Sequence, residues 1–244
     1  MKLRRSVVSL IHFGASATMA MLAYGLVFGI WYPKPLAGAV GVTSIFLLLL
    51  GVDVCLGPIL TFIVYRPGKP RVRMDLAIIV AVQILAFGYG MFSVAMARPV
   101  WLVFNVNRFS LEQANSLDLS HVQHAASDYR HTPWLGPQWV AAKFPEQRSE
   151  RNKLLFESVQ GGADLPQRPD LFVPLTAEAD ALRQHARPMD LLEKYNDAAV
   201  VHAVLADAPN CDGWLPLVVR GKSKVACFDQ KTLTYFKVLD LAPF

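Results

Sequence analysis

Three long apolar stretches occupy the first hundred residues of this 244-residue chain, and they constrain its fold more than any other feature. They run over residues 7–31, 36–65 and 76–97. Each reaches the roughly 20 residues that a helix needs to cross a hydrocarbon layer about 30 Å thick. Because backbone amides find no water in lipid, each stretch is expected to be helical. The sequence therefore predicts a three-helix transmembrane domain over 1–97.

The charged residues are divided unevenly between the two parts of the chain. Only 18% of all residues are charged, against about 25% in an average soluble domain. Residues 1–98 contain nine Lys or Arg and two acids, whereas 99–244 contain 15 basic and 17 acidic residues. A nucleic-acid-binding protein concentrates positive charge on a folded surface. Here the positive charge flanks apolar runs, so we expect contact with membrane lipid and no nucleic-acid partner.

The basic residues of the short loops predict the orientation. They gather at the N-terminus, in Lys2, Arg4 and Arg5, and in the loop 66–73, whereas the loop 32–35 has only Lys34. Loops rich in Lys and Arg stay on the cytoplasmic side. We therefore expect a multi-pass inner-membrane protein with a cytoplasmic N-terminus and a periplasmic domain over 98–244. The alternative for 7–31 is a cleaved signal peptide, whose apolar core is usually only about 7 to 15 residues long.

The second stretch contains an acid, Asp53, near its middle, followed by Gly57 and Pro58. Thirty residues form a helix of about 45 Å, which calls for tilt, a protruding end or a kink. Pro58 predicts a kink because it cannot donate a hydrogen bond to the carbonyl of Val54. An ionised carboxylate at this depth costs at least about 2.5 to 3.5 kcal/mol, so Asp53 is expected to be protonated, hydrogen-bonded or paired.

Two roles remain open for Asp53: an internal clamp between helices, or a contact with a partner protein. The candidate clamp residues on the other spans are Ser16, Thr18, Gln83 and Tyr89. The GxxxG pattern of Gly25 and Gly29 allows close helix packing, either within this bundle or with another protein. Asp75 lies at the start of the third stretch, where a negative charge suits a helix N-terminus.

Residues 98–244 have the length of one domain and predict a mixed α+β fold. Strands are expected at 100–109 and 138–144, and helices at 110–126, 145–159, 176–186 and 188–206, with Gly161-Gly162 ending the second helix. Alternating patterns at 214–220, 224–229 and 233–241 predict a C-terminal antiparallel β-meander. Its turns are expected at Gly221-Lys222 and Asp229-Gln230.

Cys211 and Cys227 could form a disulfide, since such bonds persist in exported domains. A hairpin centred on Gly221-Lys222 would place Cys227 opposite Pro216 or Leu217, so Cys211 would have to fold back to reach it. A weak metal-site candidate has side chains at helical spacings of three and four: His121, His124, Asp128 and His131. The sequence has no HExxH, GxSxG, Walker or dinucleotide-binding pattern. We therefore expect neither a cofactor nor catalysis.

The residues 51–61, 65–69 and 75–76 resemble the TfpX/TfpZ family of type IV pilin accessory proteins. The likeness continues at 83, 89–90, 97–100, 104 and 108–109, and more loosely at 136–137, 154–156, 161–162 and 167–169. Residues of these motifs are expected to bind a partner or to hold the fold together: Asp53, Gly57, Pro58, Asp75, Gln83 and Arg98. The resemblance implies a non-enzymatic inner-membrane protein of a Gram-negative bacterium that assists the major pilin and its assembly into type IV pili.

This resemblance suggests a mechanism. A pilin subunit waits in the inner membrane with one apolar helix in lipid, and that helix carries an acid beside a free amine. Asp53, protonated or paired with that amine, is expected to hold the helix while the outer domain covers the pilin head, in contact with the pilus assembly machinery. The alternative is a membrane-anchored metal-dependent enzyme that modifies pilin or envelope components at the cluster His121 to His131.

Overall fold

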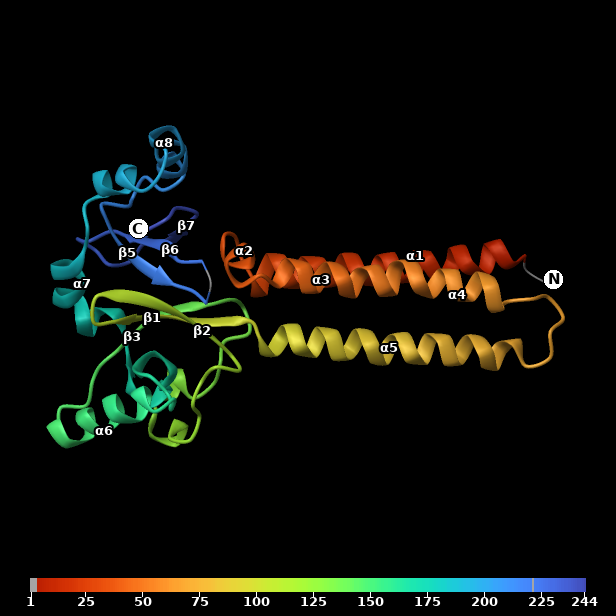
Figure 1. The fold of residues 1–244 in the computed structure, drawn as a ribbon, viewed down its shortest axis with the longest axis horizontal. Coiled ribbons are helices and arrows are strands. Elements are labelled where there is room, and N and C mark those ends of the chain that lie inside the picture. The colour runs from red at the N-terminus through yellow and green to blue at the C-terminus, as the bar shows by residue number, and fades with distance from the viewer. Residues whose placement is uncertain (1–3, 221) are drawn as a thin grey trace. The chain divides into compact units, whose positions relative to one another are not determined.

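The computed structural model describes residues 4–220 and 222–244, and its elements form two compact units (Figure 1). The helical unit comprises the chain up to Ile30 and Gly41–Met96. The globular unit comprises Trp31–Val40 and Ala97–Phe244. The predictions for Lys2 and for the turn residue Gly221 lie outside the described residues. The segment between the first two apolar helices thus belongs to the globular unit, which the sequence did not indicate.

The helical unit contains the three predicted apolar helices. The first is α1 (Arg5–Leu26) with a π-helical turn (Val27–Trp31); the second is α3 (Val42–Gly51), a π-helical turn (Val52–Leu56) and α4 (Gly57–Val64); the third is α5 (Val72–Met96). By length and composition, Arg5–Trp31, Val42–Val64 and Val72–Met96 are suited to cross a membrane. The prediction of three such helices is confirmed.

The second span is shorter than the predicted 36–65. Gly41 has a φ of 75° and separates α2 (Leu36–Val40) from α3. A left-handed conformation favours glycine because it has no Cβ. The stretch is therefore broken at Gly41, and its first residues form α2 in the globular unit. Before Pro58 the helix has a π-helical turn, and Pro58 lies in the first turn of α4; the kink expected at Pro58 stays a prediction.

One mixed sheet forms the framework of the globular unit, in the order β4-β3-β1-β2-β5-β6-β7 (Figure 1). Its strands are β1 (Pro99–Asn105), β2 (Arg108–Gln113), β3 (Gln138–Ala142), β4 (Phe172–Val173), β5 (Gly213–Val218), β6 (Lys224–Phe228) and β7 (Phe236–Leu239). The pairs β1–β3 and β2–β5 are parallel, and the others are antiparallel. The predicted β-meander is confirmed as β5–β6–β7, which continues the same sheet.

The helices of the globular unit are shorter than predicted. After β1 they are α6 (Arg148–Val159), α7 (Ala179–His185) and α8 (Ala198–Ala206), in addition to α2, with 3-10 turns at Val122–His124, Ser127–Tyr129, Leu165–Gln167, Pro169–Leu171, Leu175–Glu178 and Met189–Lys194. The predicted strand 100–109 is two strands, β1 and β2. The predicted helix 110–126 is wrong, because its first residues belong to β2, which pairs with β1 and β5. The predicted helix 188–206 is interrupted before Asp197, whose carboxylate caps α8.

The main hydrophobic core joins the sheet to α2. Leu102 and Phe104 of β1 and Leu215 of β5 belong to the same cluster as Leu36 and Ala39. The side chain of Leu36 is only 1% exposed. A short loop between two apolar helices therefore supplies part of the core of the globular unit.

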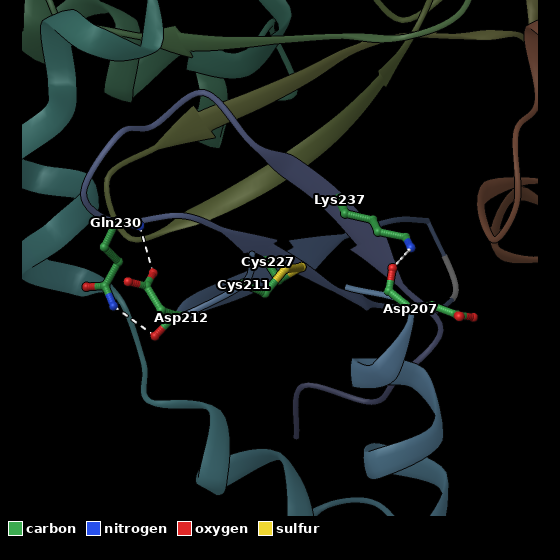
Figure 2. The surroundings of a disulfide bond; sticks show 6 residues. All are labelled: Asp207, Cys211, Asp212, Cys227, Gln230 and Lys237. Carbon is green, nitrogen blue, oxygen red and sulfur yellow. Dashed lines mark hydrogen bonds between the residues drawn. A yellow bond between two sulfur atoms is a disulfide. The ribbon is translucent and has the colours of Figure 1, made fainter. Parts of the chain in front are cut away.

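A disulfide joins Cys211 to Cys227, with 5.6 Å between their Cα atoms (Figure 2). The register differs from the expected one, since Cys227 lies opposite Trp214 and not opposite Pro216 or Leu217. Cys211 reaches Cys227 because the chain before β5 turns back, with the Cys211 amide donating to the carbonyl of Ala208 at 3.1 Å. The disulfide thus fastens the end of the α8 segment to the β-meander.

Candidate functional site

The π-helical turn Val52–Leu56 buries Asp53 inside the helical unit. Asp53 is 4% exposed, and neither carboxylate oxygen has a partner with normal hydrogen-bond geometry among the described residues, although the Gln83 side chain interacts with the carboxyl group. Buried polar groups in proteins are normally hydrogen-bonded, because an unpaired one keeps its full desolvation cost. Asp53 is therefore a strong candidate for contact with a ligand or partner.

The helix α1 contacts α4 through two polar side chains, one at Pro58 and one at Thr61. The Ser9 hydroxyl donates to the carbonyl of Pro58 at 2.8 Å. The His12 Nδ1 lies 2.6 Å from the Thr61 hydroxyl. These contacts fix which faces of α1 and α4 meet, next to the Asp53 turn.

The helix α5 contacts the π-helical turn around Asp53 through the side chain of Gln83. The Gln83 side-chain amide donates to the backbone carbonyl of Asp53 at 3.2 Å, while its Oε1 has no partner in the part of the chain that the structure describes. A Cβ added to Gly57 would lie 2.0 Å from the Gln83 Nε2. Glycine at 57 therefore allows Gln83 to approach, which gives this motif residue a structural role.

A cavity of about 430 Å³ lies between α1 and α5, with Asp53 and Thr61 of the second apolar helix also lining it. This volume is within the range of about 300 to 1,000 Å³ that is typical of ligand sites. Its remaining walls are mostly apolar and come from α1 and α5: Val8, Ile11, His12, Ala15, Ser16, Met19, Leu76, Val80, Gln83 and Ile84. The cavity thus combines an unpaired buried acid with walls suited to an apolar partner.

The structure separates the four clamp candidates. Ser16 and Gln83 line the cavity with Asp53. Thr18 donates instead to the carbonyl of Gly14 in its own helix, and Tyr89 is 75% exposed. His12 and Thr61 were not predicted as neighbours of Asp53, although a histidine inside an apolar span is itself a signal of function.

The remaining motif residues lie outside this cavity. Asp75, in the first turn of α5, forms an ion pair with Lys69 at 2.6 Å. Arg98 belongs to the globular unit and is 2% exposed. Burial lowers the pKa of Arg98, while the nearby Tyr32 opposes this effect. Arg98 is therefore a core residue of the globular unit, where its guanidinium contacts the loop 132–137.

The metal-site candidate is not assembled. The candidate rested on the helical spacings of three and four among His121, His124, Asp128 and His131, but their segment contains only short 3-10 turns. The spacing argument therefore fails. Within 4–220 and 222–244, no group of three or more His, Cys, Asp or Glu side chains has an arrangement that could hold a metal ion.

A separate pocket of about 200 Å³, with more polar walls, lies beside β2 in the globular unit and is lined in part by Glu112. Glu112 is 7% exposed, and its Oε2 accepts a hydrogen bond from the Ser116 hydroxyl at 2.7 Å. Burial raises the pKa of Glu112 to about 7; Asp164 acts in the same direction, whereas Ser116 and Arg220 oppose the shift. Glu112 therefore titrates near neutral pH.

The chain combines three apolar helices that are suited to cross a membrane, one of which contains the buried Asp53, with a globular α+β unit built on a mixed seven-stranded sheet. The sequence profile of the family described as "Fimbrial assembly protein FimB" matches residues 3–41. The chain is 35% identical over 185 residues to the fimbrial assembly protein of serogroup I from Dichelobacter nodosus, covering 75% of this chain and 71% of that protein. The chain belongs to the fimbrial assembly protein family.

Two further similar proteins from Dichelobacter nodosus are also fimbrial assembly proteins. The serogroup E1 protein is 34% identical over 185 residues, covering 75% of this chain and 71% of the relative. The protein of serogroups C1 and C2 is 39% identical over 121 residues, covering 48% of this chain and 92% of the relative. No solved structure matches the chain. The family membership supports a role in fimbrial or pilus biogenesis.

Proposed function

We propose that this chain is a non-enzymatic accessory protein of the inner membrane that holds a major pilin subunit before its assembly into a type IV pilus. Its membership of the fimbrial assembly protein family supports the assembly role. The resemblance to TfpX/TfpZ proteins at 51–61 supports pilin as the partner. The observation that carries the proposal is the buried, unpaired carboxyl group of Asp53 in a largely apolar cavity.

In this mechanism, the apolar helix of a pilin subunit packs along the opening between α1 and α5 and places side chains in the cavity. The Val80 and Ile84 side chains of α5 and the Ile11 side chain of α1 offer it apolar contact. Asp53 binds the free amine of the pilin helix or, when protonated, donates a hydrogen bond to it. Either contact compensates for the cost of a carboxyl group in lipid.

The globular unit covers the pilin head on the periplasmic side. Four basic residues in the loop after α4 and in the first turn of α5 support a cytoplasmic location for that loop: Arg66, Lys69, Arg71 and Arg73. The globular unit follows α5 and lies on the opposite side of the membrane in this orientation. Two contacts with one subunit, in lipid and at the head, raise the overall affinity through effective concentration.

The test is co-purification of the major pilin with variants of the full chain from membranes. Asp53→Leu removes both charge and hydrogen bonding, and we expect at least a tenfold loss of recovered pilin. Asp75→Asn is the matched control, because Asp75 is an acid outside the cavity that pairs with Lys69. Unchanged recovery with Asp53→Leu refutes the proposal.

A further variant separates the two forms of the contact. Asp53→Asn keeps the size and hydrogen-bonding capacity of the side chain but removes its charge. Loss of pilin with Asp53→Asn identifies an ion pair with the amine. Retention of pilin with Asp53→Asn, together with loss in Asp53→Leu, identifies a neutral hydrogen bond.

A further inference from the structure

Two consecutive apolar side chains project from the loop 132–137 of the globular unit. Trp134 is 60% exposed and Leu135 is 88% exposed. The next residue, Gly136, has a φ of 95°, so the chain turns directly after them. The turn presents both side chains at the tip of the loop, where apolar surface in water is unfavourable. They therefore need an apolar environment that the globular unit itself does not supply.

Arg98 holds this loop in place. Its guanidinium lies over the Trp134 ring, 3.9 Å from the ring centroid. Its Nη2 donates to the Thr132 hydroxyl at 3.1 Å, and its Nε and Nη2 each lie 3.4 Å from the carbonyl of Pro133. A cation over an aromatic face combined with these hydrogen bonds fixes the backbone as well as the indole. The exposure of Trp134 and Leu135 therefore belongs to an anchored loop.

The residues that contact the loop also mark the ends of two apolar helices. The ring centroids of Trp31 and Trp134 are 6.2 Å apart, and Trp31 is the last residue of the apolar helix Arg5–Trp31. Arg98 follows Met96, the last residue of α5, by two positions. Taken as membrane spans, both helices end at the surface of the bilayer. The loop thus lies at the depth where tryptophan is enriched in membrane proteins.

We propose that the loop 132–137 inserts Trp134 and Leu135 into the headgroup and upper acyl region of the bilayer, as an interfacial lipid contact of the globular unit. The charge next to the loop fits this partner: the loop 132–137 contains no acid, and Arg130 and His131 directly precede it. Basic residues next to an apolar tip attract anionic lipid phosphates. The proposed lipid contact does not depend on the proposed pilin partner.

The test places an environment-sensitive nitrobenzoxadiazole label on the full chain in vesicles of phosphatidylethanolamine and phosphatidylglycerol. Cys55→Ala removes the free cysteine, and the disulfide protects the other two. Leu135→Cys carries the label at the loop tip. Val106→Cys is the matched control, since Val106 is apolar, 57% exposed and lies just beyond the end of β1 farthest from Arg98. A strand of this length spans about 20 Å.

We expect lipids with a shallow nitroxide group to quench the label at 135 at least threefold more strongly than the label at 106. Aqueous iodide is expected to show the opposite preference. Equal quenching at both positions overturns the assignment to this loop. A label at 135 that is protected from both quenchers shows that protein covers the loop, which also overturns it.

A second measurement uses the unlabelled chain and does not require a cysteine variant to fold. Trp134→Phe is expected to remove part of the tryptophan fluorescence that lipid nitroxides quench. Trp139→Phe is the control, because Trp139 packs against the main core of the globular unit. If the two substitutions lower the quenchable fraction equally, Trp134 is not in lipid.

Discussion

Replacing Glu112 by Gln tests the electrostatics of the pocket beside β2. Burial raises the pKa of Glu112 from 4.5 to about 7. Each pKa unit corresponds to about 1.4 kcal/mol, so the ionised carboxylate reduces the free energy of unfolding by about 3 kcal/mol at pH 8.5. The folded state binds the proton more tightly than the unfolded state, so this contribution to stability falls as the pH rises from about 4.5 to 7.

Glu112→Gln remains neutral at every pH and keeps an oxygen that can accept from the Ser116 hydroxyl. We expect the variant to be more stable than the wild type at pH 8.5 by up to about 3 kcal/mol. In a unit of this size, that difference corresponds to about 6 to 12 °C in Tm. The two proteins are expected to converge at pH 4.5. The assay is thermal unfolding of the full chain in detergent, monitored through tryptophan fluorescence.

The control for this comparison is Glu146→Gln, because the Glu146 side chain is 88% exposed and pairs only loosely with Lys143, at 3.5 Å. A surface pair of this kind contributes little to stability. The control should therefore follow the wild type at both pH values. If Glu112→Gln raises the Tm equally at pH 4.5 and 8.5, or not at all, the raised pKa of Glu112 is refuted.

Two further predictions concern packing. Leu36→Ala should destabilise the globular unit by about 2 to 5 kcal/mol, because it removes a side chain from the core of that unit. The same unfolding assay measures the loss. An equal loss with Lys34→Ala, at an exposed position of the same segment, would contradict the prediction. Gly57→Ala should be less stable than Gly51→Ala, which has open space around it, because the Cβ at 57 moves the end of the Gln83 side chain away from the Asp53 carbonyl. Resistance to denaturing detergent measures both variants, and equal resistance would refute the close approach.

Local signals predicted the parts of the fold that depend on local chemistry. The three apolar helices follow from length and composition, and the β-meander follows from alternation at 214–241. The helix predicted over 110–126 is wrong, because its first residues belong to β2. This strand pairs with β1, which directly precedes it, and with β5, which lies far along the chain. The assignment of Leu36–Val40 to a membrane span failed for a similar reason, since apolar residues suit a protein core as well as lipid.

At the candidate site, too, the sequence indicated the important residue but not its neighbours in space. Asp53 could be singled out from the sequence because a carboxyl group inside an apolar span is costly wherever it lies. Its neighbours depend on which helix faces meet: Gln83 reaches the Asp53 turn, whereas Thr18 bonds within α1. The four metal candidates required a helix that did not form. Residue chemistry was therefore predictable, and the arrangement around it was not.

The chain passes between the helical and globular units three times, after Ile30, after Val40 and after Met96. The first passage has no free linker, because Trp31 and Tyr32 are 7% and 1% exposed and belong to the globular unit directly after the first apolar helix. Effective concentration at a second binding contact falls as the connecting linker lengthens. A short connection of this kind fits the proposed contact of both units with one pilin subunit.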